Sequence, residues 1–175
     1  WLMAFGNYFN PIKHIGIGVG HSPSSFQMVQ YNYLMDVNIG IDMFDDPNPY
    51  YMSIEHNVIN VFPWIPLPMP YINNFGIFVG NCFSAPGNTN INNNSVHNAR
   101  TGIFSYFSQG VNIQLNHDIT FAPSLVSATT TTLRGIYVLK SPFNRVEDNY
   151  VHQLGGVPTT FSNLTAARLM RGIDI

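Results

Sequence analysis

The sequence predicts an all-β protein, built as a parallel β-solenoid of about six coils with three short strands per coil. A repeated asparagine pattern, a Gly-Ile step after each repeat, and short alternating apolar segments between them predict this fold. The pattern apolar-x-x-Asn-x-apolar recurs around six asparagines, Asn7, Asn32, Asn57, Asn94, Asn116 and Asn149. The Gly-Ile steps follow at Gly16-Ile17, Gly40-Ile41, Gly76-Ile77, Gly102-Ile103, Gly135-Ile136 and Gly172-Ile173.

The spacing between these markers separates a fixed arc of the coil from a variable one. Each glycine is followed by the next pattern asparagine after 14 to 18 residues, whereas each asparagine precedes its glycine by 8 to 23 residues. The long intervals place insertion loops near residues 60–74, 120–134 and 153–171, all on the same arc. We therefore expect one domain over residues 1–175, with the loops gathered on one side.

The repeat predicts what each marker does. In a strand, alternate side chains share a face, so the isoleucine of each Gly-Ile step and the residue two positions later point inward. Stacked coils repeat every ~4.8 Å, which places like residues on like and predicts an aliphatic column. The pattern asparagines are expected at a sharp bend, because asparagine tolerates the left-handed backbone and its amide can bond to the next asparagine.

The composition excludes several classes of protein. Hydrophobic residues make up 45% of the chain and charged residues 9%, a balance that excludes both disorder and a coiled coil. A net charge of −2 provides no basic surface for nucleic acid or anionic lipid. No apolar run reaches ~18 residues, so no membrane span is predicted. The lone Cys82 excludes an intrachain disulfide.

The chain resembles the right-handed parallel β-helix repeat proteins of the pectate-lyase-like superfamily. Two paired segments carry the resemblance, Gly16-Ile-Gly-Val19 with Val29-Gln-Tyr-Asn-Tyr33, and Gly135-Ile-Tyr-Val138 with Asn144-Arg-Val-Glu-Asp-Asn149. It implies a right-handed coil and a secreted carbohydrate-binding or polysaccharide-processing protein of the lyase, hydrolase or epimerase type. The alternative within the same superfamily is a non-catalytic structural or adhesive solenoid of the cell surface or of a filament.

Two further features bear on location and extent. The resemblance, the low charge and the glycosylation-type sequons at Asn93 and Asn163 predict an extracellular or cell-surface protein. Neither end of the sequence carries a polar cap, and uncapped sheet edges invite association. We therefore expect the chain to be a segment of a longer solenoid or to associate with copies of itself.

A turn column five and six residues after each glycine holds the candidate catalytic residues His21, Asp45, Asp46 and Lys140. His21 and Asp45 belong to neighbouring coils, so their backbones are expected ~5 Å apart, close enough for an imidazole-carboxylate pair. The segment from Lys140 to Asn144 is similar to the Lys-Ser-x-x-Asn segment of alginate lyases and chondroitinase B, in which the lysine is the base. The matching arginine-bearing segment is absent here.

The same acidic region contains a candidate calcium site formed by Asp42, Asp45 and Asp46, because Ca²⁺ prefers clustered carboxylate oxygens. The alternative is that Asp45-Asp46-Pro47 is simply a turn. No other cofactor is predicted.

Aromatic residues supply the candidate substrate-binding surface. Phe78, Phe104 and Tyr137 follow three Gly-Ile steps and are expected in one outward-facing column, where they would contact sugar rings or lie beneath a loop. Trp64 anchors the proline-rich loop beside them. We expect a polysaccharide or cell-surface glycan to cross this column.

Three polar outliers have structural explanations. Asp118 falls in an apolar column, and a one-residue bulge would turn Ile119 inward instead. His97 and His152 occupy equivalent positions two coils apart, ~10 Å, which is too far for one metal ion. Surface imidazoles are the expected outcome.

Overall fold

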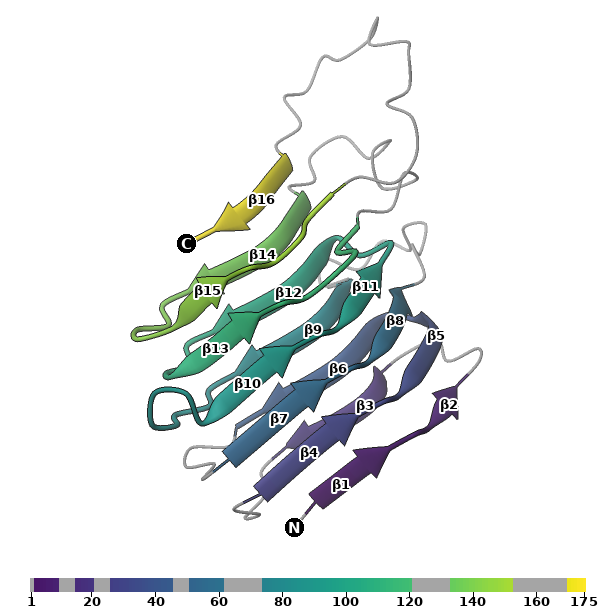
Figure 1. Cartoon of the computed structure of the whole chain (residues 1–175), viewed down its shortest axis with the longest axis horizontal. Helices are drawn as coiled ribbons and strands as arrows, with labels where there is room; N and C mark the ends of the chain where they lie inside the picture. The colour runs from purple at the N-terminus through teal and green to yellow at the C-terminus, as the bar shows by residue number, and fades with distance from the viewer. Residues whose placement is uncertain are drawn as a thin grey trace, which may run out of the picture.

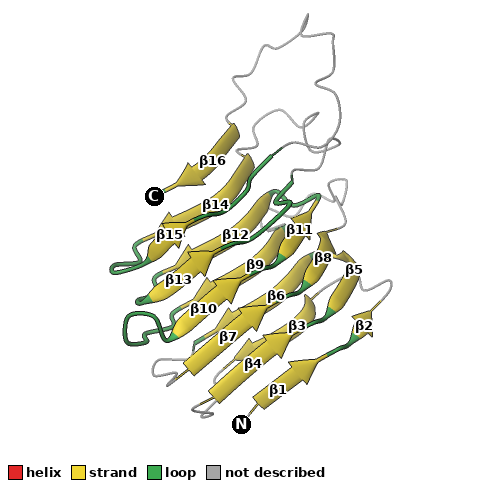
Figure 2. Ribbon diagram, in the orientation of Figure 1, coloured by secondary structure: helices red, strands yellow, loops and turns green. Residues whose placement is uncertain are grey.

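The computed structural model describes residues 2–9, 15–20, 26–45, 51–61, 74–120, 133–152 and 170–175. All regular structure in these ranges is β-strand, and no helix occurs among them (Figure 2). The candidate residues His21, Asp46 and Trp64 lie outside the described residues, as do most of the three insertions.

The strands form three parallel sheets, which we call A, B and C. Sheet A is β1 (Leu2–Phe5), β4 (Phe26–Gln30), β7 (Tyr51–Glu55), β10 (Thr89–Asn92), β13 (Val111–Gln114) and β15 (Arg145–Glu147). Sheet B is β2 (Tyr8–Phe9), β5 (Tyr33–Val37), β8 (Val58–Val61) and β11 (Ser95–His97). Sheet C is β3 (Ile15–Gly20), β6 (Ile39–Phe44), β9 (Phe75–Gly80), β12 (Thr101–Tyr106), β14 (Leu133–Leu139) and β16 (Met170–Asp174).

From β1 to β12 the chain visits sheets A, B and C in that order again and again, and each strand pairs with the strand one visit later (Figure 1). This arrangement is compatible with a β-solenoid. The first insertion lies between β8 of sheet B and β9 of sheet C, with Val61 and Asn74 as its described flanks. The other two lie between Thr120 and β14, and between His152 and β16, so all three precede a strand of sheet C.

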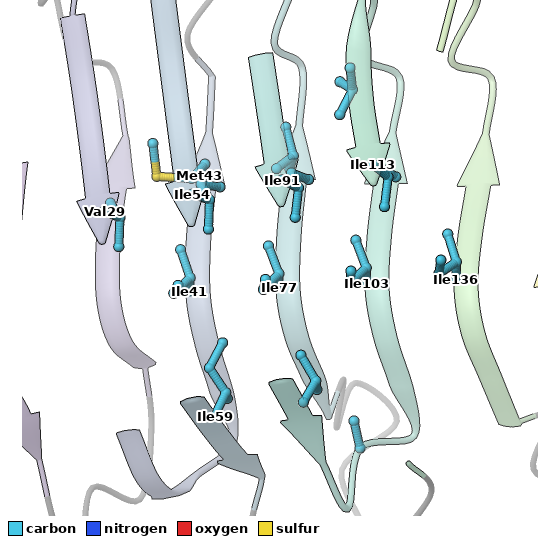
Figure 3. Packing of buried hydrophobic residues seen from close by; sticks show 14 of the residues in the cluster. Val29, Ile41, Met43, Ile54, Ile59, Ile77, Ile91, Ile103, Ile113 and Ile136 are labelled. Atoms are coloured by element: carbon cyan, nitrogen blue, oxygen red, sulfur yellow. The ribbon is translucent and has the colours of Figure 1, made fainter. Parts of the chain in front are cut away.

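The predicted columns are confirmed by the strand register. The isoleucines of the Gly-Ile steps are consecutive partners across sheet C, in the order Ile17, Ile41, Ile77, Ile103, Ile136 and Ile173. On sheet A the same relation joins Ala4, Val29, Ile54, Ile91, Ile113 and Val146. The two columns face each other across the interior, where the middle members of both are fully buried (Figure 3).

The six pattern asparagines form the predicted ladder at the bend between sheets A and B. Each of the first five donates its side-chain Nδ2 to the Oδ1 of the next, at distances of 2.8 to 3.0 Å. The backbone N–H of each also donates to that same Oδ1. Every middle asparagine is buried, so the ladder satisfies amides that the bend would otherwise leave without partners.

The expected left-handed conformation falls one residue earlier than predicted. The positive φ angles belong to Gly6, Tyr31, His56, Asn93, Leu115 and Asp148, each directly before a ladder asparagine. The ladder asparagines are therefore selected for their amides, and the preceding residue makes the bend.

A second polar ladder, which the sequence pattern did not indicate, lies at the turn after sheet C. The Ser108 Oγ accepts the backbone N–H of Cys82 at 3.1 Å, and the Ser141 Oγ accepts the N–H of Ser108 at 3.0 Å. The Ser108 hydroxyl lies 3.0 Å from the carbonyl of Tyr106 and can donate to it. Serine hydroxyls thus accept hydrogen bonds from backbone N–H groups at this turn, as asparagine amides do at the bend between sheets A and B.

The glycines of the Gly-Ile steps are required for space. A Cβ at Gly76 would lie 2.1 Å from the Val96 Cγ1 on sheet B and 2.5 Å from the carbonyl oxygen of Gly102. Gly40 and Gly102 face Ile59 and Ile119 in the same way, at 2.4 and 2.3 Å. Sheet C therefore approaches sheet B too closely for any side chain at these positions.

Replacing Gly76 by alanine should lower the free energy of unfolding by about 3 kcal/mol, because the backbone atoms around it cannot move aside. Gly18→Ala is the matched control on the outer face of sheet C, where the nearest atom to a Cβ lies at an ordinary 3.6 Å. Its effect should stay under about 1 kcal/mol. Urea unfolding of both variants measures the difference, and equal stabilities would contradict the steric explanation.

The structure confirms the bulge predicted at Asp118, which turns Ile119 inward instead. Asp118 is exposed with a φ of 53°, and Ile119 is fully buried in its place. The left-handed backbone at Asp118 takes up the extra residue and keeps the apolar column intact.

Candidate functional site

The aromatic column occupies the outer face of sheet C. Phe78, Phe104 and Tyr137 lie at the centres of β9, β12 and β14 and are direct register partners. All three are half-buried. The sequence-predicted column is therefore present and reaches solvent.

The rings of this column pack against one another. Phe104 and Tyr137 are stacked with centroids 4.8 Å apart and an interplanar angle of 10°, while Phe78 and Phe104 are tilted at 5.4 Å. Phe75 adds a ring 5.4 Å from Phe78. Because the stacked pairs Phe104–Tyr137 and Phe75–Phe78 cover ring faces, a ligand on this column would contact mainly ring edges.

An ion pair closes the column at the C-terminal side. The Arg134 guanidinium lies 4.1 Å from the centroid of the Tyr137 ring, and its Nε donates to the Asp174 Oδ2 at 2.7 Å. Asp174 is itself the register partner of Tyr137. Charged hydrogen-bonding groups thus border the rings at this end.

Asp42 closes the column at the other end, and its environment is unusual. Its register partners are Phe78 on one side and Gly18 on the other, so its carboxylate extends the aromatic row. The Oδ1 atom is shielded from solvent and has no hydrogen-bond partner in the described part of the chain. Burial raises the pKa of Asp42 above its usual value. This carboxylate oxygen lacks the donor that a buried acceptor normally has.

The turn column is in register, and of its four candidate catalytic residues the structure describes only Asp45 and Lys140, which lie apart. Asp45, Asn81, Phe107 and Lys140 follow one another at the turn, all with positive φ. The Asp45 Oδ1 accepts the Asn81 Nδ2 at 2.7 Å, which gives that carboxylate a structural partner. Asn81 and Phe107 separate Asp45 from the exposed Lys140.

Of the three candidate calcium ligands the structure describes Asp42 and Asp45, while Asp46 lies outside the described residues. Asp42 lies on the outer face of β6, whereas Asp45 lies in the turn beyond it and bonds to Asn81. The described ranges contain no group of three or more His, Cys, Asp or Glu side chains arranged to hold a metal ion.

The two predicted surface histidines differ in their surroundings. The His152 Nε2 lies 3.0 Å from the Asp118 Oδ1 at the rim of sheet B. His97 on β11 is half-buried, and desolvation lowers its pKa, opposed by Asp118 and reinforced by His152. Its imidazole therefore stays neutral over a wider pH range than a free histidine.

His97 also lines an open depression on the outer face of sheet B, with Tyr33, Met35, Val58, Asn60, Asn98 and Thr120. Sequence reasoning missed Asn60, Asn98 and Thr120. The only signal was their recurrence three or four positions after a ladder asparagine, which places them beside one another on successive coils.

Comparison of the chain with protein-family models, with curated proteins and with solved structures gives no match. Within the described residues, no helix is long and apolar enough to cross a membrane.

Proposed function

We propose that the chain is a right-handed parallel β-helix of the pectate-lyase-like kind, with about six coils. The repeated visiting order of sheets A, B and C, the in-register columns and the asparagine ladder support this. A β-helix stacks its coils through side-chain ladders of this kind, because each coil satisfies the polar groups of the next.

We further propose that its function is to bind carbohydrate along the outer face of sheet C, as a secreted or cell-surface protein. The observation that carries this proposal is the buried Asp42 Oδ1, which has no hydrogen-bond partner among the described residues, at the end of the row Phe78, Phe104 and Tyr137. A sugar hydroxyl would donate to this oxygen, and sugar C–H groups pack against aromatic rings.

The same residues favour binding over turnover. Polysaccharide lyases and hydrolases need an acid and a base beside one scissile bond. Along the described part of the column, Asp42 lies at one end and Arg134 with Asp174 at the other, with the rings between them. Processing of the polymer is therefore the weaker form of the proposal.

The alternative function, a structural or adhesive solenoid, is favoured by the ring geometry. The stacking of Phe104 on Tyr137 uses ring faces that a sugar would otherwise cover. In this case the aromatic row acts as a third ladder beside the asparagine and serine ladders and only stabilises the stack.

A glycan array separates the two functions. The wild-type protein should bind a defined set of glycans, and Asp42→Asn should weaken that binding about five- to tenfold by removing the charge from the acceptor. Phe104→Ala should abolish binding. Asp36→Asn is the control, because it makes the same change at a left-handed position in β5, on another sheet.

Circular dichroism establishes that each of these variants remains folded.

The Asp45→Asn variant tests whether the turn after sheet C takes part in glycan binding. Absence of glycan binding by the wild type, or binding unchanged in both Asp42→Asn and Phe104→Ala, favours the structural solenoid. Recovery of the native protein only from cytosol would contradict the extracellular location.

A further inference from the structure

The open depression on sheet B has the size and lining of a small-molecule site. Its volume is about 350 Å³, near the lower end of the ~300–1,000 Å³ that ligand pockets span. Tyr33 and Met35 come from β5, Val58 and Asn60 from β8, and His97 from β11. Parallel pairing sets these residues side by side, with Met35, Asn60 and His97 in consecutive register positions.

The polar groups of this depression are held in place and still have bonding capacity. The Asn98 Nδ2 donates to the Asn60 Oδ1 at 2.7 Å, and the Asn98 backbone N–H donates to the Thr120 Oγ1 at 3.2 Å. No hydrogen bond of the Asn60 Nδ2 or of the Asn98 Oδ1 is found among the described residues, so one amide NH₂ group and one amide oxygen remain available there. The His97 ring adds a donor and an acceptor to the same surface.

The lining carries no formal charge. None of its seven residues is Asp, Glu, Lys or Arg, and burial lowers the pKa of the His97 imidazole, which favours the neutral form. The Asp118 carboxylate acts on His97 and already pairs with His152. A charged ligand would lose hydration without gaining a counter-charge, whereas a neutral ligand avoids this cost.

The apolar part of the lining suits the C–H faces of a sugar. Tyr33 is stacked on Tyr8 at 5.3 Å with an interplanar angle of 6°, which fixes its ring, and Met35 and Val58 continue the apolar surface beside it. A sugar presents alternating hydroxyl and C–H groups. The depression offers polar partners for the hydroxyls in its amides, hydroxyl and imidazole, and an aromatic edge for the C–H groups.

We propose that the depression lined by Tyr33, Met35, Val58, Asn60, His97, Asn98 and Thr120, which we call the sheet B pocket, binds an uncharged polyhydroxylated ligand the size of a mono- or disaccharide. It is a second site, independent of the aromatic row, because the two lie on different sheets and share no residue.

Methyl NMR of the full chain with ¹³C-labelled methionine tests the proposal directly. The Met35 signal, assigned with Met35→Leu, should shift saturably with neutral mono- and disaccharides and remain unchanged with galacturonate or glucuronate. His97→Ala and Asn98→Gly should each weaken binding about tenfold, which corresponds to one lost hydrogen bond. Glycine retains the positive φ of Asn98, so this variant removes the amide without backbone strain.

Two controls make the outcomes distinct. His117→Ala removes an exposed imidazole beside Ser95 and outside the pocket, and it should leave the Met35 titration unchanged. Asp42→Asn should also leave it unchanged even where it weakens binding on sheet C. A Met35 signal that no neutral sugar shifts, equal binding of uronates, or shifts that persist in both His97→Ala and Asn98→Gly would each overturn the sheet B pocket without affecting the proposal for sheet C.

Discussion

Replacing Asn94 by alanine should remove a large part of the stability of the protein. The Asn94 Oδ1 accepts two hydrogen bonds from Asn57, through the backbone N–H at 3.0 Å and Nδ2 at 2.9 Å. Its Nδ2 donates to the carbonyl of Ile54 at 2.8 Å and to the Asn116 Oδ1 at 3.0 Å. Alanine breaks all four bonds in a fully buried site, so polar atoms on both sides of the gap lose their partners.

We expect a loss of about 4 kcal/mol or more, because each unsatisfied buried group costs about 1–3 kcal/mol and the effects are not fully additive. That is a large part of the ~5–15 kcal/mol that folded domains possess. Equilibrium unfolding in urea, followed by far-ultraviolet circular dichroism, measures the change.

Asn90→Ala is the matched control for this experiment. Asn90 lies on the same strand, β10, but on its outer face, where its Nδ2 donates to the carbonyl of Gly87 and its Oδ1 accepts the Asn112 Nδ2 at 3.1 Å. We expect an effect under about 1 kcal/mol. Similar losses in the two variants would mean that the ladder adds nothing beyond an ordinary surface bond.

The strand register was predictable from the sequence because the repeat specifies it. A strand has a side-chain period of two, so a column that places Ile41, Ile77 and Ile103 inward leaves one register for the whole sheet. The asparagine ladder was predictable for the same reason, since six residues of one type at equivalent positions must stack.

Details within each coil were not predictable. The left-handed residue before each ladder asparagine varies from tyrosine to leucine, so composition carried no signal of it. The sequence pattern did not predict the ladder of Ser108 and Ser141, because the equivalent position on the preceding coil is a cysteine, Cys82. Ring orientation in the aromatic row depends on side-chain torsions, which a sequence pattern does not specify.

The sites were predictable in part. Phe78, Phe104 and Tyr137 were placed correctly, because alternation decides which side of a strand faces out. The isolation of the Asp42 carboxylate depends on what its neighbours leave unbonded, which only coordinates reveal. The sheet B pocket combines different residue types from successive coils, so no motif marks it.

Replacing Ile103 by aspartate should prevent folding. Ile103 is fully buried in the middle of its column, between Ile77 and Ile136 (Figure 3). A carboxylate there has no cation to pair with in the surrounding aliphatic column, and an unpaired buried charge costs several kcal/mol or more. We expect no cooperative unfolding transition at neutral pH, whereas Ile103→Val should lower the free energy of unfolding by only about 1 kcal/mol.

Ile173→Asp provides the internal control, because it makes the same change in the same column at its end. Ile173 is 49% exposed, so a carboxylate at this position remains hydrated and should cost under about 1 kcal/mol. The difference between the free energies of unfolding of the two variants measures how strongly water is excluded from the middle of the column compared with its end. A folded Ile103→Asp protein with near wild-type stability would mean that water reaches the middle of the column, and the aliphatic ladder would then not be what holds the sheets together.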